Sequence, residues 1–375
     1  MSFSSSYTSK IYIENQCFEA SVLMTKNYWK DFSDWQALRF CLDWMKGEQV
    51  FFQQTSGSTG TPKTIPITRK QMLASIHLTQ KTFSLTSKDK ALVAVNTSFI
   101  AGKMMLARAL QIGMDMFIAP ISANPLLAIQ KSCFSDFQPT FAAFVPYQLS
   151  TMIDNDASLA RLRQFRVILI GGASVSTSLA EKINTLLTDV EVFHTYGMTE
   201  TASHIAIRSI RNQPDEPIFE VLEGITINKD ERNCLKICGE VTNNEWITTN
   251  DLVEILDCRC FRLIGRIDNV INSGGIKISL EEIEQKIAPC LHDLTWKRYF
   301  LAGLPDEKWG EKLVLFLEGT SFHWKEEETL RQRIAQFLEP YQRPKEIFFL
   351  EKFEETDSQK IDRKKTIANF QKNNG

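Results

Sequence analysis

Two different patterns of apolar and polar positions follow one another along the chain, and they change near Pro217. Before that point, short apolar runs alternate with longer segments whose apolar residues recur at helical spacing. We expect strands at the short runs and helices between them. Short strands that alternate with helices predict a parallel sheet covered by helices on both faces. The predicted strands are Ala91–Asn96, Met114–Ala119, Thr140–Val145, Arg166–Ile170 and Val190–His194.

The start of the chain carries its own local signals. Ile11–Phe18 predicts an opening strand. Ser33 and Thr68 are each followed three residues later by Gln, which is the spacing of a capping box. We therefore expect one helix to begin at Ser33 and stop at Gly47, and another to begin at Thr68.

Beyond Pro217 the apolar runs become short and are separated by turns, which predicts an antiparallel or barrel-like portion. Further on, a helix capped by Ser279 and another over Glu326–Phe337 alternate with strands, which is an α+β pattern. The fold class is therefore α/β, with a large N-terminal domain and a small C-terminal one. We expect the boundaries at 1–264 for the large domain, 265–268 for a hinge and 269–375 for the small domain.

A segment of Ser, Thr and Gly that ends in Pro-Lys, TSGSTGTPK, lies between two apolar runs. Glycines allow close backbone approach, so successive N–H groups can converge on an anion, and the hydroxyls and the Lys add donors. It is not a Walker A loop, because Pro62 takes the place of that motif's second glycine and a strand follows. We predict a phosphate-binding loop of Thr55, Ser56, Gly57, Ser58, Thr59, Gly60, Thr61 and Lys63.

This loop resembles the phosphate loop of the adenylate-forming superfamily, which includes acyl-CoA ligases, and further motifs follow in that family's order. Tyr196-Gly-Met-Thr-Glu200 resembles the element that binds the AMP phosphate. The resemblance implies catalytic roles for Thr199 and Glu200, with Glu200 as the Mg²⁺ ligand, an oxygen donor that suits this ion. It also implies AMP contacts from Tyr196, Gly197, Met198 and Thr199.

Other parts of the nucleotide site follow from the same resemblance. Asp251 takes the place of the aspartate that holds both ribose hydroxyls, and a carboxylate suits this role because it accepts two hydrogen bonds. The family's Thr-Gly-Asp here reads Thr249-Asn250-Asp251. The strand end that lines the adenine pocket is matched by Gly171, Gly172 and Ala173.

The C-terminal motifs imply a mobile domain, as in acyl-CoA ligases. Gly265-Arg-Ile-Asp268 resembles the hinge signature, in which Arg266 contacts the nucleotide and Asp268 is the pivot. Lys360 takes the place of the catalytic lysine, although Gln359 replaces the usual Gly before it. The coenzyme A segment is matched by Ser273, Gly274 and Gly275.

The resemblance implies an enzyme that uses ATP, Mg²⁺ and coenzyme A to convert an acid into a thioester. The run His194–Arg208 and the segment Phe99–Lys103 are similar to o-succinylbenzoate–CoA ligases of menaquinone synthesis, which act on an aromatic keto-diacid. Its unreacted carboxylate requires a cation or donors, for which Lys103, Arg108 and His204 are candidates. The candidate substrate residues are Phe99, Lys103, His194 and His204.

Two alternatives remain open at this point. The chain could act on another acid, or be a stand-alone adenylation domain that serves a carrier protein. It could also be a non-catalytic nucleotide-binding relative, although the intact Lys360, Glu200 and phosphate loop weigh against this.

Composition and charge exclude several other classes of protein function. A net charge of -2 argues against nucleic-acid binding through a basic face. No apolar run reaches the roughly 20 residues of a membrane span, and the N-terminus has no apolar signal core, so we expect a cytoplasmic protein. The eight cysteines are expected to be reduced thiols, with a zinc site at Cys234, Cys238, Cys258 and Cys260 as a less favoured alternative. The sequence leaves the oligomeric state undetermined.

Overall fold

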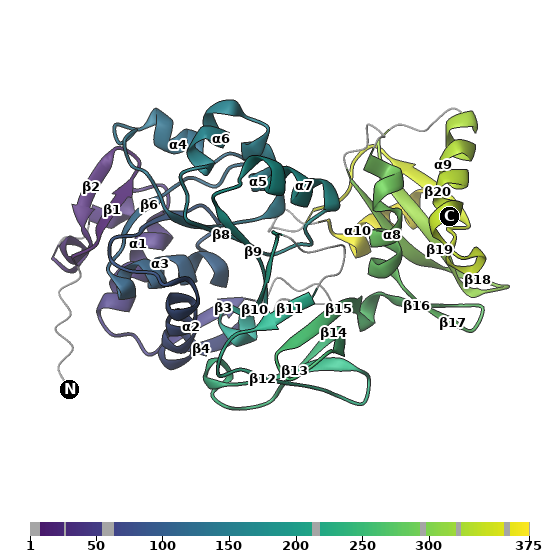
Figure 1. Cartoon of the computed structure of the whole chain (residues 1–375), viewed down its shortest axis with the longest axis horizontal. Helices are drawn as coiled ribbons and strands as arrows, with labels where there is room; N and C mark the ends of the chain where they lie inside the picture. Colours follow the sequence, from purple (N-terminus) through teal and green to yellow (C-terminus); the bar gives the residue numbers. More distant parts are fainter. Residues whose placement is uncertain are drawn as a thin grey trace.

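The computed structural model describes residues 8–25, 28–54, 64–211, 218–292, 298–319, 324–355 and 361–374. Its architecture is mixed α/β, with a large portion built on one long sheet and a smaller portion toward the C-terminus (Figure 1). The predicted fold class is confirmed. In the part of the chain that is described, no helix is long and apolar enough to cross a membrane.

The first half of the large sheet is parallel, as the alternating pattern predicts. Each neighbouring pair of its strands runs parallel. In spatial order the strands are β1 (Lys10–Ile13), β6 (Asp115–Ile118), β5 (Lys90–Val93), β7 (Phe141–Phe144), β8 (Val167–Ile170) and β9 (Glu191–Gly197).

Helices cover both faces of these strands, so successive residues of a strand are apolar whichever face they point to. Strand β8 is an example. Val167 and Leu169 belong to one hydrophobic cluster, whereas Ile168 and Ile170 belong to another on the opposite face. Figure 1 shows the two groups of helices on opposite sides. One face carries α1 (Trp35–Met45), α2 (Arg69–Phe83) and α3 (Ile100–Ile112); the other carries α4 (Leu126–Lys131), α5 (Pro146–Ile153), α6 (Asp156–Leu162) and α7 (Thr177–Leu186).

The second half of the same sheet is antiparallel and open, so the expected antiparallel pairing is confirmed and a barrel is not formed. After β9 the order is β10 (His204–Ser209), β11 (Ile218–Val221), β15 (Cys260–Arg266), β14 (Ile247–Ile255), β13 (Cys234–Cys238) and β12 (Thr226–Lys229). The sequence predicts two strands here, Glu245–Thr249 and Leu252–Leu256, where the structure has the single strand β14. A register shift between Leu252 and Val253 explains this, because a bulge interrupts the alternation without ending the strand.

Two local expectations near the start of the chain were wrong. The predicted opening strand is a hairpin of β1 and β2 (Gln16–Glu19), in which Glu14 adopts a φ of 53°. The helix α1 is capped by Asp34 and not by Ser33, since the Asp34 carboxylate accepts the backbone N–H of Ala37 at 3.1 Å. The capping box at Thr68 is confirmed.

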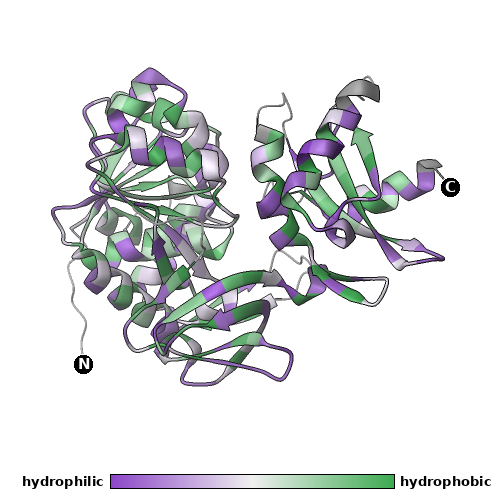
Figure 2. Cartoon of the chain, turned by 45° about the vertical axis from the view of Figure 1, so that its right-hand side comes forward, coloured by the Kyte–Doolittle hydropathy of each residue, from purple (hydrophilic) through white to green (hydrophobic). Residues whose placement is uncertain are grey.

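A separate sheet forms the smaller portion, with α8 (Leu280–His292) and α9 (Trp324–Phe337) contributing to one apolar cluster and α10 (Arg363–Asn374) packing against another. Figure 2 shows that apolar residues concentrate in the strands, between helices with polar outer surfaces. The strands are β16 (Val270–Ser273), β17 (Ile276–Ser279), β18 (Tyr299–Asp306), β19 (Gly310–Glu318) and β20 (Glu346–Leu350).

Candidate active site

Two of the predicted groups, the phosphate loop at 55–63 and Lys360, lie outside the described residues. The flanks of the loop are described. Strands β3 (Val50–Gln54) and β4 (Thr64–Thr68) pair antiparallel, with Gln54 opposite Thr64. The side-chain amide of Gln53 donates to the carbonyl of Ser98 at 2.7 Å, so the strand that enters the loop is joined to the start of α3. Phe99 and Lys103, two candidate substrate residues, lie on that first turn.

Thr199 and Glu200 lie on the short helix η3 (Thr199–Thr201), directly after β9. Internal hydrogen bonds shape this turn: the Thr201 hydroxyl accepts the N–H of Met198 at 3.1 Å and lies 2.7 Å from the carbonyl of Ser203. The helix η3 lies beside β4, the strand that leaves the phosphate loop. The fold therefore brings the Thr199–Glu200 turn close to the strand that follows the phosphate-loop sequence.

Gly197 is required where β9 meets β10. It pairs with His204, and its φ is not in the left-handed region, so the requirement is steric. A Cβ at this position would lie 2.5 Å from the Cα of His204 and closer still to the carbonyl oxygen of Ser203. Because these are backbone atoms, no side-chain rotation relieves the clash.

Arg108 and His204 are buried next to each other beneath the η3 turn. Arg108 is 2% exposed and donates to the hydroxyls of Ser203 at 2.7 Å and Thr79 at 3.2 Å. His204 is 6% exposed, and its ring nitrogens lie 3.3 Å from the Ser203 hydroxyl and 3.5 Å from that of Thr79. Burial lowers the pKa of Arg108 to about 9. In the described part of the chain no carboxylate pairs with Arg108, and its side-chain partners there are the hydroxyls of Ser203 and Thr79.

Acid should destabilise the protein through His204. Burial, together with the neighbouring Arg108, lowers the pKa of His204 to about 3 from an ordinary value of 6.5. Between these values the unfolded chain binds a proton that the folded chain does not bind. The contribution to stability is therefore complete above pH 6.5 and is lost as the pH falls toward 3.

Denaturant unfolding measured from pH 7.5 to 4.5 tests this expectation. His204→Gln should flatten the dependence of the unfolding free energy on pH. His77→Gln is the matched control, since His77 is an exposed histidine on α2, and it should keep the wild-type slope. Equal slopes for wild type and His204→Gln would contradict the assignment.

His194 lies with the predicted adenine residues and not with α3. Its Nε2 is 3.1 Å from the carbonyl of Ala173, so Nε2 carries the proton and Nδ1 is a buried acceptor without a partner among the described residues. Burial, with Arg208 nearby, lowers the pKa of His194 to about 4. Arg208 is opposite His194 on β10, and its Nε is likewise buried without a described partner. Unpartnered buried donors and acceptors suit a polar ligand such as a purine ring.

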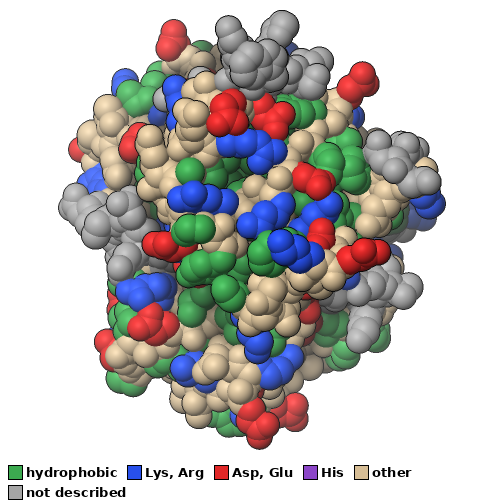
Figure 3. Space-filling view, turned by 90° about the vertical axis from the view of Figure 1, so that its right-hand side faces the viewer, with side chains coloured by type: hydrophobic (Ala, Val, Ile, Leu, Met, Phe, Trp, Pro, Cys, Tyr) green, Lys and Arg blue, Asp and Glu red, His purple; other side chains and the backbone are tan. Residues whose placement is uncertain are grey.

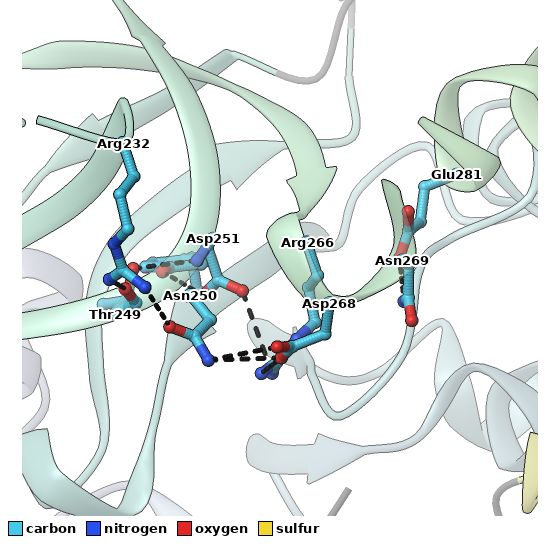
Figure 4. Close-up of polar contacts among 9 residues, drawn as sticks. Arg232, Thr249, Asn250, Asp251, Arg266, Asp268, Asn269 and Glu281 are labelled. Carbon is cyan, nitrogen blue, oxygen red and sulfur yellow. Dashed lines mark hydrogen bonds and ion pairs between the residues drawn. The ribbon is translucent and has the colours of Figure 1, made fainter. Parts of the chain in front are cut away.

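Asp251, the predicted ribose ligand, is joined by a hydrogen bond to Tyr196 on β9. The Tyr196 hydroxyl donates to Asp251 Oδ2 at 2.5 Å. Arg266 lies 3.9 Å from Asp251 Oδ1 (Figure 4). Burial, followed by the Asp251 carboxylate, raises the pKa of Tyr196 well above its usual value, so the phenol stays a donor. Arg266 also forms an ion pair with Asp268 at 2.8 Å.

The predicted coenzyme A residues form the turn between β16 and β17. Gly274 and Gly275 both adopt left-handed φ values, 61° and 86°, and the N–H of Gly274 donates to the carbonyl of Trp309 at 2.8 Å. A Cβ at Gly274 would lie 2.8 Å from the Trp309 ring. Figure 3 looks onto the C-terminal portion, where several Lys and Arg side chains lie near the middle of the face with Asp and Glu side chains among them.

The described residues that flank Lys360 in the sequence are fixed by a β-bridge, a backbone hydrogen bond and an ion pair. Ile361 pairs with Glu355, and the N–H of Asp362 donates to the carbonyl of Glu354 at 2.8 Å. Arg363 forms an ion pair with the Glu284 carboxylate on α8 at 2.9 Å.

A metal at this site would depend on the nucleotide. Among the described residues no three His, Cys, Asp or Glu side chains are grouped as a metal site, which gives the zinc alternative no support. Glu200 is half-buried on its turn. Mg²⁺ is usually held by one or two carboxylates together with substrate phosphates and water, so a single glutamate is compatible with it.

Several contacts at the site involve residues that the sequence did not single out. Arg232 and Glu281 had no motif to mark them, and Arg208 was named only as the end of the run His194–Arg208. Asn250 did carry a signal, since it stands where the family has glycine. The role of Arg108 depends on α2, α3 and the Ser203 segment meeting in space, which periodicity alone does not reveal.

Comparisons with known proteins agree with the motifs. The family model described as "AMP-binding enzyme" matches residues 19–229. The 2-succinylbenzoate–CoA ligase of Geobacillus sp. strain WCH70 is 26% identical over 337 residues, which cover 82% of this chain and 66% of that protein. The enzyme of the same name from Escherichia coli K12 is 25% identical and covers 82% and 64%. The chain thus spans about two thirds of the length of these curated relatives.

Two solved structures are also similar. An acyl-CoA synthetase (AMP-forming)/AMP-acid ligase II-like protein from Dyadobacter fermentans is 37% identical, with a TM-score of 0.60, and the match covers 93% of this chain and 98% of that one. The O-succinylbenzoate coenzyme A synthetase of Bacillus subtilis in complex with ATP and magnesium ion has a TM-score of 0.71 and 21% identity, covering 84% and 69%. At that identity the second likeness shows the fold alone.

Proposed function

Since this chain belongs to the AMP-binding enzyme family, we propose that it uses ATP to convert a carboxylic acid into a coenzyme A thioester through an acyl-adenylate. The observation that carries the proposal is the position of the Thr199–Glu200 turn beside the strand that leaves the phosphate loop. Asp251, joined to Tyr196 at the end of the same strand β9, supplies a carboxylate for the ribose.

In the first step the acid attacks the α-phosphorus of ATP and pyrophosphate leaves. The obstacle is negative charge, so positioned cations and donors supply most of the catalysis. We assign the phosphate loop to the β- and γ-phosphates and Glu200 to Mg²⁺. Lys360 would neutralise the attacking carboxylate and the α-phosphate. Asp251 would accept both ribose hydroxyls, and the Gly171–Ala173 segment with His194 would border the adenine.

In the second step the thiol of coenzyme A attacks the adenylate and AMP leaves. We propose that residues 269–375 turn about Asp268 between the steps, which withdraws Lys360 and brings Ser273, Gly274 and Gly275 toward the thiol. The left-handed φ values of both glycines support this role for the C-terminal portion, because they let the backbone approach a ligand closely.

Pyrophosphate release tests the proposal directly. A panel of aromatic and aliphatic acids would be assayed with ATP and Mg²⁺, with and without coenzyme A. Acid-dependent pyrophosphate release followed by thioester formation is expected. If the adenylate forms but no thioester appears when coenzyme A is added, the acyl group is delivered to a carrier protein instead. No release with any acid would contradict the proposed activity.

For the acid we propose o-succinylbenzoate, which is named in the relatives described above. Two cations border the start and the body of α3 and could meet the second carboxylate. Lys103 is half-buried, its ammonium group has no hydrogen-bond or ion-pair partner among the described residues, and burial lowers its pKa. Arg108 and His204 are more deeply buried, and both contact Ser203 and Thr79. Lys103 is therefore the first candidate.

Lys103→Leu should reduce the specificity constant for o-succinylbenzoate by about ten- to a hundredfold, the scale of one charge-assisted contact. Benzoate analogues without the succinyl carboxylate should lose little, and ATP binding should not change. Lys131→Leu, an exposed lysine at the end of α4 on the other face of the sheet, is the matched control. Equal losses for both acids would exclude Lys103 as the residue that reads the second carboxylate.

A further inference from the structure

Asn250 stands at the position where the resemblance predicts glycine, next to the ribose carboxylate. On β14, Asp251 accepts the Tyr196 hydroxyl, whereas the Asn250 side chain reaches the hinge. The Asn250 amide nitrogen lies 3.2 Å and 3.4 Å from the two carboxylate oxygens of Asp268 (Figure 4). A glycine has no side chain to make this contact.

The orientation of the Asn250 amide is determined by Arg232. The Arg232 guanidinium donates to Asn250 Oδ1 at 3.2 Å and to the carbonyl of Thr249 at 3.1 Å, and its own position is fixed by Asp230 at 2.8 Å. Arginine can only donate, so the amide oxygen must face it. The NH₂ group is thereby directed toward Asp268.

The hinge is held from both sides by an amide–carboxylate contact. On the side of the large sheet Asn250 donates to Asp268, which also pairs with Arg266. On the side of the C-terminal portion, Asn269 donates to Glu281 of α8. A turn of the C-terminal portion about Asp268 must break the Asn250 contact, whereas the Asn269 contact can move with α8.

We propose that Asn250 is a positioning residue that holds the hinge in the arrangement seen here and joins it to the strand that carries the ribose carboxylate. Arg266 lies between the two acids, 2.8 Å from Asp268 and 3.9 Å from Asp251, so Asp251 is linked to this guanidinium directly and Asn250 is linked to it through Asp268. The part of this inference that concerns reaction rates rests on the proposed function; the part that concerns the hinge does not.

Hydrogen–deuterium exchange of the full chain tests the hinge without any reaction. In Asn250→Gly, peptides that cover residues 265–273 should exchange about two- to tenfold faster, the range for one solvent-accessible hydrogen bond. Asn250→Asp should exchange faster still, because it places a second carboxylate against Asp268. Thr248→Gly is the matched control, since Thr248 is an exposed residue of the same strand, and it should leave the hinge peptides unchanged.

The two half-reactions give the second readout. Asn250→Gly should change the ratio of the rates of adenylate formation and thioester formation by the same two- to tenfold, whereas a general weakening of β14 would lower both rates together. Unchanged exchange in Asn250→Gly, equal acceleration in Thr248→Gly, or an unchanged ratio would each overturn the proposal. Faster exchange in a protein whose wild type forms no adenylate would support the hinge contact and contradict the proposed function instead.

Discussion

Replacing Lys360 with alanine is expected to slow acyl-adenylate formation by about 10² or more, the scale of losing one key electrostatic contact to a transition state. The physical reason is charge: without the ammonium group, the attacking carboxylate approaches phosphate oxygens of the same sign. Thioester formation from supplied acyl-adenylate should be largely spared, because the proposed second step does not use this lysine. Single-turnover measurements of each half-reaction provide the comparison.

Lys372→Ala is the control for this variant, since it removes an exposed lysine from the last turn of the adjoining helix α10 without changing the motif lysine. It should leave both half-reactions close to wild type. If Lys360→Ala slows both steps equally, the lysine has no special part in adenylation. If it slows neither, the resemblance of this motif is misleading.

Gly197→Ala is expected to cost about 1–3 kcal/mol of stability or more, the range for forcing extra volume into a packed site. The added Cβ meets backbone atoms of Ser203 and His204, so β9 and β10 must separate. That separation would displace the η3 turn that carries Thr199 and Glu200. Unfolding free energy and ATP binding should therefore fall together.

Gly171→Ala provides the matched comparison for the same change. Gly171 also lies outside the left-handed φ region, and its added Cβ would meet a side-chain atom, the Thr195 hydroxyl oxygen, at 2.9 Å. A hydroxyl can shift where backbone cannot, so the loss of stability should be smaller. A larger loss at position 171 than at 197 would contradict the steric argument.

The sequence predicted the fold where the pattern was long and regular. The parallel strands and the capping box at Thr68 were found from periodicity and from one pair of residues. The short helices α5 and α6 were missed because each is too brief to show a helical period. The hairpin at Glu14 was missed because Glu rarely adopts a positive φ.

The sequence predicted which residues belong to the candidate site, because they lie in motifs. It did not predict which of these residues contact one another. Tyr196 and Asp251 were each assigned to the nucleotide, but nothing in the sequence indicated that one donates to the other. Asp34 was overlooked as a helix cap in favour of Ser33, although its carboxylate also accepts the hydroxyl of Thr97 at 3.0 Å. Such contacts join segments distant in the sequence, which only the folded chain brings together.

The strand β9 has a consequence for how this protein could change its substrate. Three residues with proposed nucleotide roles follow one another along β9 and its turn: His194, Tyr196 and Thr199. In these roles a single stretch of chain recognises the base, the ribose and the phosphate of the nucleotide. A one-residue insertion there would move Tyr196 to the opposite face and disrupt all three at once. The acid would be read from α3 instead. Substitutions on α3 can therefore change which acid the protein prefers, while β9 and its nucleotide contacts stay the same.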